Sequence, residues 1–475
     1  MALTSIGLGA LISWTYIVFL SWAVLTPEHG DANLLDKAHS VSYMGLVVAL
    51  LVLAILSRPG TALASRIERC VAGTQGARLS PAVALASVSA LVMCAGTVVI
   101  IAGEQGQLGR GVYHVAALAS GAGLGALFAQ AATKVSRLPR RSIPVCLAIA
   151  FVIAAALYTL ALHLPSGPTH IISLILPLVG ASLLILPVEG DASASAQDER
   201  LALKGMAPQD LPRAIVCFCV LGFAEGVARG FFLQANPHAN PVLHRWVFLM
   251  ATVIACLLLL LAAFHGRGLV GITSAGRAGM LMLAFMFLLA PIVEELGLVA
   301  DVLTNASHIL LLLIEWTLLA QYVNAYRPSA ARAFGFGLGI AYLGWVAGDV
   351  TGNALAPRFG SSYHLESLIA LVCACLTMLA FFLIVHDRSI AEVVSEDDHA
   401  GAPRRFMERC EDVAREYGLT KKETEVMVLI AKGRSAQRVQ EIMGIAAGTV
   451  NTHLAHIYRK LNVHTRQEML DKIER

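Results

Sequence analysis

Several ionisable side chains lie inside long apolar stretches of this sequence. Glu225 and Arg229 stand four residues apart within CVLGFAEGVARGFF, so they share one helical face and can pair. Glu315 lies within LLLIEWTLLAQ, and Asp349 lies in another apolar stretch. Charge inside a lipid bilayer is costly, so each such residue is a candidate for binding a polar ligand. The candidate ligand contacts are Glu225, Arg229, Glu315, Trp316, Asp349, Arg110, Tyr113 and His114.

Two structural explanations compete with ligand binding. A Glu225–Arg229 ion pair can simply satisfy itself, and charged residues near a membrane surface can extend their ends into water. The lone histidines His163 and His308 are better explained as interfacial residues. The sequence contains no His-Glu-x-x-His, no phosphate-binding Gly-Lys loop and no hydrolase nucleophile motif. It therefore indicates neither an enzyme nor a metal or cofactor site.

A second group of polar residues lies near the C-terminus, on a segment patterned for helices. Apolar residues recur at helical spacing around Val426, Val439 and Val450, and Gly444 marks a turn between the second and third stretches. This pattern predicts a helix-turn-helix, whose second helix can enter the major groove of DNA. That helix, from Thr449 to Leu461, has no acidic residue. Its polar side chains include Thr449, Asn451, Thr452, His453, His456, Arg459 and Lys460.

The same segment resembles the LuxR/GerE family of bacterial transcription regulators. The matching residues are Leu419, Thr420, Glu423, Glu425, Val426, Gly433, Ser435, Gly448, Thr449, Val450, His453, Ile457, Lys460, Leu461, Asn462, Val463 and Arg466. The resemblance implies a four-helix domain that binds promoter DNA through its third helix. It places base contacts at Asn451, Thr452 and Ala455, and phosphate contacts near Lys421, Arg434, Ser435 and His453. Arg459 and Lys460 add positive charge to the same helix.

The resemblance also implies a homodimer on DNA, paired through the last helix, from Thr465 to Ile473. There Met469, Leu470 and Ile473 form an apolar patch, which packing inside the domain would explain equally well. Two residues depart from the family pattern. Asn451 stands where the family usually has Lys, and Ala446 stands where it usually has Ser, a substitution that costs a helix N-cap about 1 kcal/mol.

Most of the chain has the composition of a membrane protein. Only 14% of its 475 residues are charged, 57% are hydrophobic, and the mean hydropathy is +0.70. Because a helix needs about 20 apolar residues to cross a bilayer, the sequence predicts an all-α, polytopic protein with about twelve spans. The predicted spans are Ser5–Leu25, His39–Ser57, Pro81–Ala102, Gly111–Ala132, Ile143–Leu162, Thr169–Val188, Leu211–Phe232, Leu243–Phe264, Gly276–Leu298, Leu303–Ala325, Ala333–Leu355 and His364–His386.

Loop charges predict the orientation in the membrane. One set of loops carries nearly all the Lys and Arg, including Lys134, Arg137, Arg140 and Arg141, and this set is expected to face the cytoplasm. An even number of spans then places both termini in the cytoplasm, where a DNA-binding domain must be. The sequence thus predicts a multi-pass protein of the bacterial inner (cytoplasmic) membrane.

Six plus six helices around a polar, cytoplasmic loop at about 189–210 resemble the major facilitator fold. The analogy implies that the first, fourth, seventh and tenth helices line a cavity. Glu225, Arg229, Glu315 and the Arg110–His114 group would then converge, with Trp14 or Tyr16 adding aromatic surface. In that family the loop between helices two and three carries an Asp after a Gly. The corresponding loop here reads SRPGTALASRIERC and has no Asp. This favours a sensor over a working transporter.

The predicted organisation has three parts: a transmembrane sensor domain at 1–388, a linker and preceding helix at 389–416, and a LuxR-type domain at 417–475. The predicted function is a one-component transcriptional regulator that binds a small-molecule inducer within the membrane. The alternative is a major-facilitator-like transporter with a fused regulatory domain. Small residues at Gly344, Gly348 and Gly352, and at Gly121 and Gly125, predict close helix packing.

Overall fold

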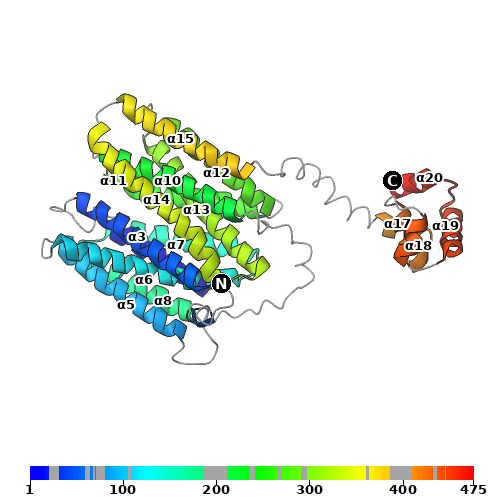
Figure 1. The fold of residues 1–475 in the computed structure, drawn as a ribbon, viewed down its shortest axis with the longest axis horizontal. Helices are drawn as coiled ribbons and strands as arrows, with labels where there is room; N and C mark the ends of the chain where they lie inside the picture. The colour runs from blue at the N-terminus through cyan, green and yellow to red at the C-terminus, as the bar shows by residue number, and fades with distance from the viewer. Residues whose placement is uncertain are drawn as a thin grey trace. The chain divides into compact units, whose positions relative to one another are not determined.

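The computed structural model divides the chain into two compact units, Met1–Ile384 and Val385–Arg475 (Figure 1). It describes residues 1–20, 32–58, 65–67, 70, 81–104, 109–186, 211–235, 241–264, 269–289, 297–359, 363–385, 409–431, 436–443 and 446–474. The predicted loop at about 189–210 lies outside the described residues, as do Arg434, Ser435 and most of the predicted linker.

The first unit is a bundle of long, apolar helices, the class that lipid demands because a helix satisfies its own backbone. In the first half these are α1 (Ala2–Leu20), α3 (Ala32–Leu56), α5 (Pro81–Glu104), α6 (Arg110–Ser136), α7 (Ser142–His163) and α8 (Ser166–Ile185). In the second half they are α10 (Leu211–Ala235), α11 (Pro241–Phe264), α12 (Leu269–Leu289), α13 (Gly297–Tyr326), α14 (Ala330–Phe359) and α15 (Tyr363–Val385).

Eleven helices among the described residues are long and apolar enough to cross a membrane, against the twelve predicted. The difference lies in the ninth predicted span, Gly276–Leu298. The apolar stretch described there is shorter, Ala275–Leu289, and the next helix, α13, already begins at Gly297. Residues 290–296 of that predicted span lie outside the described residues.

The most extensive contacts between the two halves run along two pairs of helices. Helix α3 of the first half packs against α14 of the second, and α7 of the first packs against α11 of the second. Figure 1 shows α3 and α14 running side by side through the bundle. Within the halves, α3 packs on α6, and α10 packs on α14. A movement of one half against the other would therefore change the contacts of residues on α3 and α14.

Glycines bring α10 and α14 to very close approach. A Cβ added at any of the six glycines of this contact would come within 3.0 Å of a backbone atom of the facing helix. The six are Gly222, Gly226 and Gly230 on α10 and Gly344, Gly348 and Gly352 on α14. The predicted packing through the α14 glycines is confirmed, and Gly121 of α6 makes a similar contact with Ser42 of α3. Small residues in fixed rows are what allow backbones to meet in lipid.

The second unit contains a helix at 409–416, then α17 (Lys421–Ala431), α18 (Ala436–Met443), α19 (Ala447–Leu461) and α20 (Arg466–Glu474). These helices share one core, in which Val426, Val450 and Ile457 are fully buried. Cys410 and Val413 of the helix at 409–416 belong to the same core. The C-terminal unit therefore has a hydrophobic core of its own.

Reciprocal caps begin two of these helices. At α17 the backbone amide of Thr420 donates to Glu423 Oε2 at 2.7 Å, and the amide of Glu423 donates to Thr420 Oγ1 at 3.3 Å. At α20 the amide of Glu468 donates to Thr465 Oγ1 at 3.1 Å, and the Glu468 carboxylate accepts from the amide of His464, one residue before Thr465, at 2.8 Å. These capping boxes satisfy amides that have no partner inside the helix. Ala446, the N-cap residue of α19, makes no side-chain cap, as the sequence indicates.

The α10–α14 contact yields a test. Replacing Gly348 with Ala places a methyl group against the backbone of Phe223, so the helices must separate. Overpacking of this kind costs about 1–3 kcal/mol, and we expect a lower melting temperature for the purified protein in detergent, followed by tryptophan fluorescence. Gly111→Ala is the matched control, since nothing lies within 4 Å of a Cβ there. Equal melting of Gly348→Ala and wild type would contradict the close contact.

Candidate functional site

A network of charged side chains lies within the membrane unit, centred on Arg229 of α10 and Asp349 of α14. Arg229 Nη1 donates to Asp349 Oδ1 at 3.1 Å. The Asp349 carboxylate is fully buried, and its other oxygen accepts a hydrogen bond from Ser40 of α3. Because α3 belongs to the first half and α14 to the second, Asp349 links the two halves by a charge-assisted bond.

Glu225 of α10 is held by His308 of α13. The imidazole Nδ1 of His308 contacts Glu225 Oε2. The His308 side chain is 43% exposed, whereas the Glu225 side chain is only 12% exposed. The sequence suggested a pair along one helix, and the structure gives Glu225 and Arg229 partners on two other helices.

Glu315 of α13 is the most isolated carboxylate of the network. The residue is 5% exposed, and its Oε1 has no hydrogen-bond partner among the described residues. It interacts electrostatically with Glu225, a second negative group. Burying a charged group without a partner is costly, so this position calls for a positive charge or a proton. Its neighbour Trp316 is a packing residue between Phe128 of α6 and Phe334 of α14, with ring centroids 5.5 and 5.3 Å apart.

Aromatic rings from both halves surround these charges. On α3, His39 and Tyr43 face Trp345 of α14 at 5.1 and 5.0 Å between ring centroids, and Tyr43 lies 5.2 Å from Tyr342. The guanidinium of Arg229 lies over Trp345 at 5.4 Å, within the range of a cation–π contact. His39 is 2% exposed, and both its ring nitrogens lack hydrogen-bond partners among the described residues.

A second aromatic contact joins the halves through α1, α7 and α11. Tyr16 of α1 packs against Phe248 of α11 at 4.5 Å, and Tyr158 of α7 packs on the same ring at 5.4 Å. Electrostatic interactions connect Tyr342 of α14 to Tyr16 and to Glu315. The charged network therefore lies at the junction of the halves, among side chains of α1, α3, α10, α13 and α14.

The structure brings together four of the sequence-predicted ligand contacts, Glu225, Arg229, Glu315 and Asp349. Tyr113 lies elsewhere in the first half: its ring covers Gly103 of α5 and packs against His114 at 5.8 Å. The side chain of Arg110 lies outside the described residues. Sequence reasoning missed His39, Ser40 and Tyr43, although all three stand in one predicted span, and it treated His308 as interfacial.

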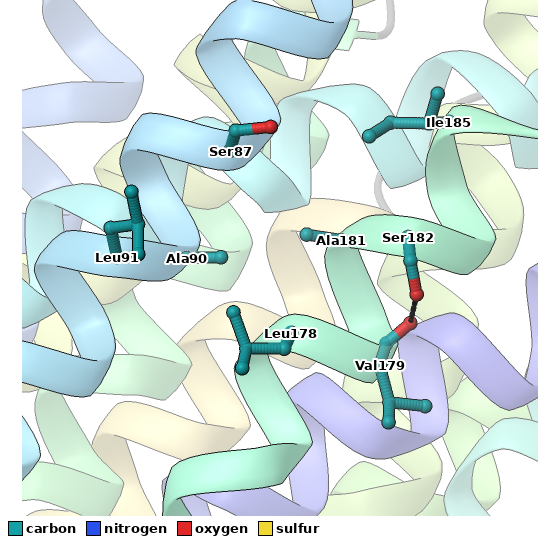
Figure 2. A pocket seen from close by; sticks show the side chains of 8 residues that line it. All are labelled: Ser87, Ala90, Leu91, Leu178, Val179, Ala181, Ser182 and Ile185. Carbon is teal, nitrogen blue, oxygen red and sulfur yellow. Dashed lines mark hydrogen bonds between the residues drawn. The ribbon is translucent and has the colours of Figure 1, made fainter.

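An open groove of about 460 Å³ lies between α5 and α8 (Figure 2). Its lining is apolar apart from Ser87 and Ser182, and the Ser182 hydroxyl donates to Val179 O of its own helix at 3.0 Å. Leu91 and Leu178 on its walls are largely exposed. This groove has the character of a lipid-facing surface, with no charged group to orient a polar ligand.

In the C-terminal unit, α19 presents a polar face to solvent. Its apolar residues Val450, Ile457 and Leu461 are buried, which leaves the opposite side exposed. The predicted DNA contacts Thr449, Asn451, Thr452, Ala455 and Arg459 are all exposed, whereas His453 is half-buried. Thr452 Oγ1 donates to Gly448 O at 2.8 Å, which leaves its oxygen able to accept from a base. The helix ends at Asn462 in the left-handed region, with φ 51°.

Lys460 has a structural role that the sequence did not reveal. Its ammonium donates to Glu423 Oε2 at 2.7 Å and to Gly418 O at 3.0 Å, joining the end of α19 to the start of α17. The hydrogen bond from Lys460 holds the pKa of Glu423 down, from an ordinary value of 4.5 to about 2. The capping amide and hydroxyl of Thr420 act in the same direction, against the opposing effect of desolvation. Lys460 therefore joins α19 to α17 within the domain and also adds positive charge to α19.

The remaining predicted contacts of this unit lie on α17, on α20 and in a segment outside the described residues. Lys421 is exposed at the first turn of α17, while Arg434 and Ser435 lie outside the described residues. On α20, Met469 and Ile473 are buried in the core, and Leu470 is half-buried. The apolar patch predicted to pair two copies is thus largely used inside the domain. Pairing through α20 stays a prediction, and of that patch Leu470 is left to support it.

Residues 418–473 match the family of bacterial regulatory proteins named luxR. The chain is also 32% identical over 65 residues to an uncharacterized response regulatory protein, YgeK, of Escherichia coli strain K12. That match covers 13% of this chain and 44% of the relative, so less than half of the relative's length is compared. The C-terminal unit carries a LuxR-type helix-turn-helix domain.

The membrane unit is similar in fold to solved transporters. The human organic anion transporter MFSD10 superposes with a TM-score of 0.56 at 13% identity, covering 80% of this chain and 98% of that one. A bacterial homologue of the iron transporter ferroportin gives 0.53 at 11%, covering 81% and 99%. FucP of E. coli, a Major Facilitator Superfamily transporter, gives 0.52 at 11%, covering 80% and 97%. The unit is a multi-pass membrane domain of the major facilitator fold. Regulator and transporter families of these kinds are not enzymatic.

The Lys460–Glu423 bond predicts the acid stability of the C-terminal unit. Because folding lowers the pKa of Glu423, the ionised Glu423 carboxylate stabilises the folded domain. This stabilisation is complete above the unfolded pKa of 4.5 and is lost as the pH falls through about 2. Glu423→Gln should cost roughly 1–3 kcal/mol at pH 7 and weaken this acid dependence, as measured by urea unfolding of the fragment Val385–Arg475 at several pH values.

Glu425→Gln is the control, because Glu425 makes an exposed ion pair with Lys422 that contributes little. Equal stability of Glu423→Gln and Glu425→Gln at pH 7 would contradict the structural role of the bond.

Proposed function

We propose that this chain, a LuxR-type DNA-binding domain joined to a membrane domain of the major facilitator fold, is a one-component transcriptional regulator. A small molecule bound within the membrane unit alters how the C-terminal unit acts on promoter DNA. The observation that carries the proposal is the charged network at the junction of the halves, in a chain that also bears a DNA-reading helix. Both the sensing element and the output element are then parts of one polypeptide.

The network supplies a physical route from ligand to conformation. Asp349 binds Arg229 within the second half and Ser40 of the first half, so a ligand that competes for these groups changes the energy of packing the halves together. A ligand shifts such an equilibrium only by its difference in affinity for the two packings. A coupling of about 1–3 kcal/mol is enough for a 5–150-fold change in response.

A further contact between the halves lies at the end of the bundle that bears the basic loop. Asn324 of α13 donates through Nδ2 to Ser136 O at 3.0 Å and to Leu138 O at 3.1 Å, and Arg140 Nε donates to Asn324 Oδ1 at 3.4 Å. The neighbouring Lys134 and Arg137 support a cytoplasmic location for this end. Both termini would then be cytoplasmic, on the side where promoter DNA is found.

Transport is the second candidate function, because the fold covers nearly the whole length of known transporters. MFSD10 is an organic anion transporter, and FucP is a fucose:proton symporter. Uptake of a labelled ligand into proteoliposomes separates the two functions. Substrate-specific accumulation would favour a transporter that also regulates, whereas binding without accumulation supports a sensor.

The exposed face of α19 predicts which residues contact DNA bases and which contact the DNA phosphates. Asn451→Ala and Thr452→Ala should change the preferred operator, each with a cost of about 1–3 kcal/mol at its own base position. Arg459→Ala should weaken binding to all sequences and reduce the salt dependence by about one phosphate contact. Gel shifts of the fragment Val385–Arg475 against a randomised operator library measure both effects. An unchanged operator preference in the Asn451/Thr452 double variant would place the reading face elsewhere.

The charged network predicts the signalling phenotype. Glu225→Gln, Arg229→Gln and Glu315→Gln should each abolish or lock the response of a promoter reporter, because each removes a charge that the two packings hold differently. Glu366→Gln on α15 is the control, a membrane-helix carboxylate outside the network. Protein levels and DNA binding by the isolated C-terminal unit should stay unchanged. Normal switching in all three network variants would show that the network is structural.

A further inference from the structure

The network has more negative than positive groups. Among its described side chains, Glu225, Glu315 and Asp349 are acidic, and Arg229 is the one side chain that is always cationic. Asp349 pairs with the guanidinium of Arg229, and Glu225 pairs with His308. A positive charge on a protonated His308 would therefore be neutralised by Glu225. Glu315, which has an unpartnered oxygen and is almost fully buried, is the acid left over. Glu315 is therefore placed to accept a proton or to pair with a positively charged ligand.

The surroundings of that acid are aromatic. Tyr342 of α14 lies within electrostatic range of Glu315, and its ring lies 5.2 Å from Tyr43 on α3 of the other half. Trp345 packs against Tyr43 at 5.0 Å, and Phe248 packs edge-on against Tyr16 of α1 at 4.5 Å. Aromatic faces attract cations and provide flat apolar surfaces, and tyrosine hydroxyls can bond an ammonium. Carboxylate and rings together match one class of ligand.

We propose that the ligand is an organic cation, a protonated amine with an aromatic or apolar body. Its ammonium pairs with Glu315, and its body lies among the tyrosine rings that the two halves contribute. This inference rests on the proposed function and specifies the ligand that the network recognises. A ligand seated in this way contacts both halves, which is the condition for a difference in affinity between two packings.

Two other ligand classes fit less well. An anion would add a further negative charge to the three carboxylates and would have to displace Asp349 from Arg229. A metal ion would need several His, Cys, Asp or Glu side chains converging on one point, and the described part of the chain has no group of three placed to hold one. An organic cation needs a single free carboxylate and apolar walls, and this site has both.

Three small probes that share a phenyl ring test the assignment: 2-phenylethylamine, 2-phenylethanol and 3-phenylpropanoate. Binding to the purified full-length protein in nanodiscs is measured at pH 7 by calorimetry and by thermal shift. We expect the amine to bind at least tenfold more tightly than the alcohol or the acid. A preference for the acid, equal binding of all three, or no binding of the amine at millimolar concentration would overturn the proposal.

Variants of Glu315 test whether the preference for the amine depends on this carboxylate. Glu315→Gln should lower the affinity for the amine at least tenfold, whereas Glu366→Gln should leave it unchanged. Glu315→Asp keeps the charge and should keep the preference for the amine at reduced affinity, which also guards against misfolding of the first variant. Unchanged amine affinity in Glu315→Gln would overturn the assignment.

A promoter reporter distinguishes this inference from the proposed function. Amine binding through Glu315 that never alters promoter activity would contradict the regulatory function and leave the ligand class standing. A promoter response to a carboxylate or a neutral compound that requires Glu225 or Arg229 would support the regulatory function and overturn the ligand class.

Discussion

The close approach of α10 and α14 is the constraint on which the membrane unit depends. Six glycines let the two backbones meet, and a side chain at any of these positions would force them apart. This contact sets Arg229 of α10 beside Asp349 of α14. In a bilayer, where water cannot solvate an isolated charge, such pairing is what makes buried ionisable residues tolerable. The glycine contact thus positions the ion pair at the junction of the halves.

The same carboxylate extends the constraint to the first half. Asp349 accepts from Ser40 of α3, and the rings of His39 and Tyr43 on that helix pack against Trp345. Charge, hydrogen bonding and aromatic packing are therefore concentrated where the halves meet. Binding of a ligand there would act on the packing of the two halves against each other. In the C-terminal unit, by contrast, the bond between Lys460 and Glu423 is internal and fixes α19 against α17.

Local patterns in the sequence predicted what depends on neighbours along the chain. Hydropathy predicted the long apolar helices of the membrane unit, and the helical spacing of small residues indicated the packing of Gly344, Gly348 and Gly352. Pairings between distant residues were not predicted. Nothing local marks His308 as the partner of Glu225, and a lysine at the end of a DNA-reading helix suggests phosphate before it suggests Glu423. Such partners follow from tertiary packing, which periodicity does not encode.

The central claim is that the membrane unit and the DNA-binding unit are energetically coupled, and such coupling is reciprocal. DNA must then shift the membrane unit as much as the membrane unit shifts DNA binding. The direct measurement is pulsed electron paramagnetic resonance in nanodiscs, with spin labels at Gly111→Cys on α6 and Arg358→Cys on α14, in a background with Cys375→Ser. We expect a duplex selected by the isolated C-terminal unit to redistribute the label-to-label distances. An unchanged distance distribution at saturating DNA would contradict it.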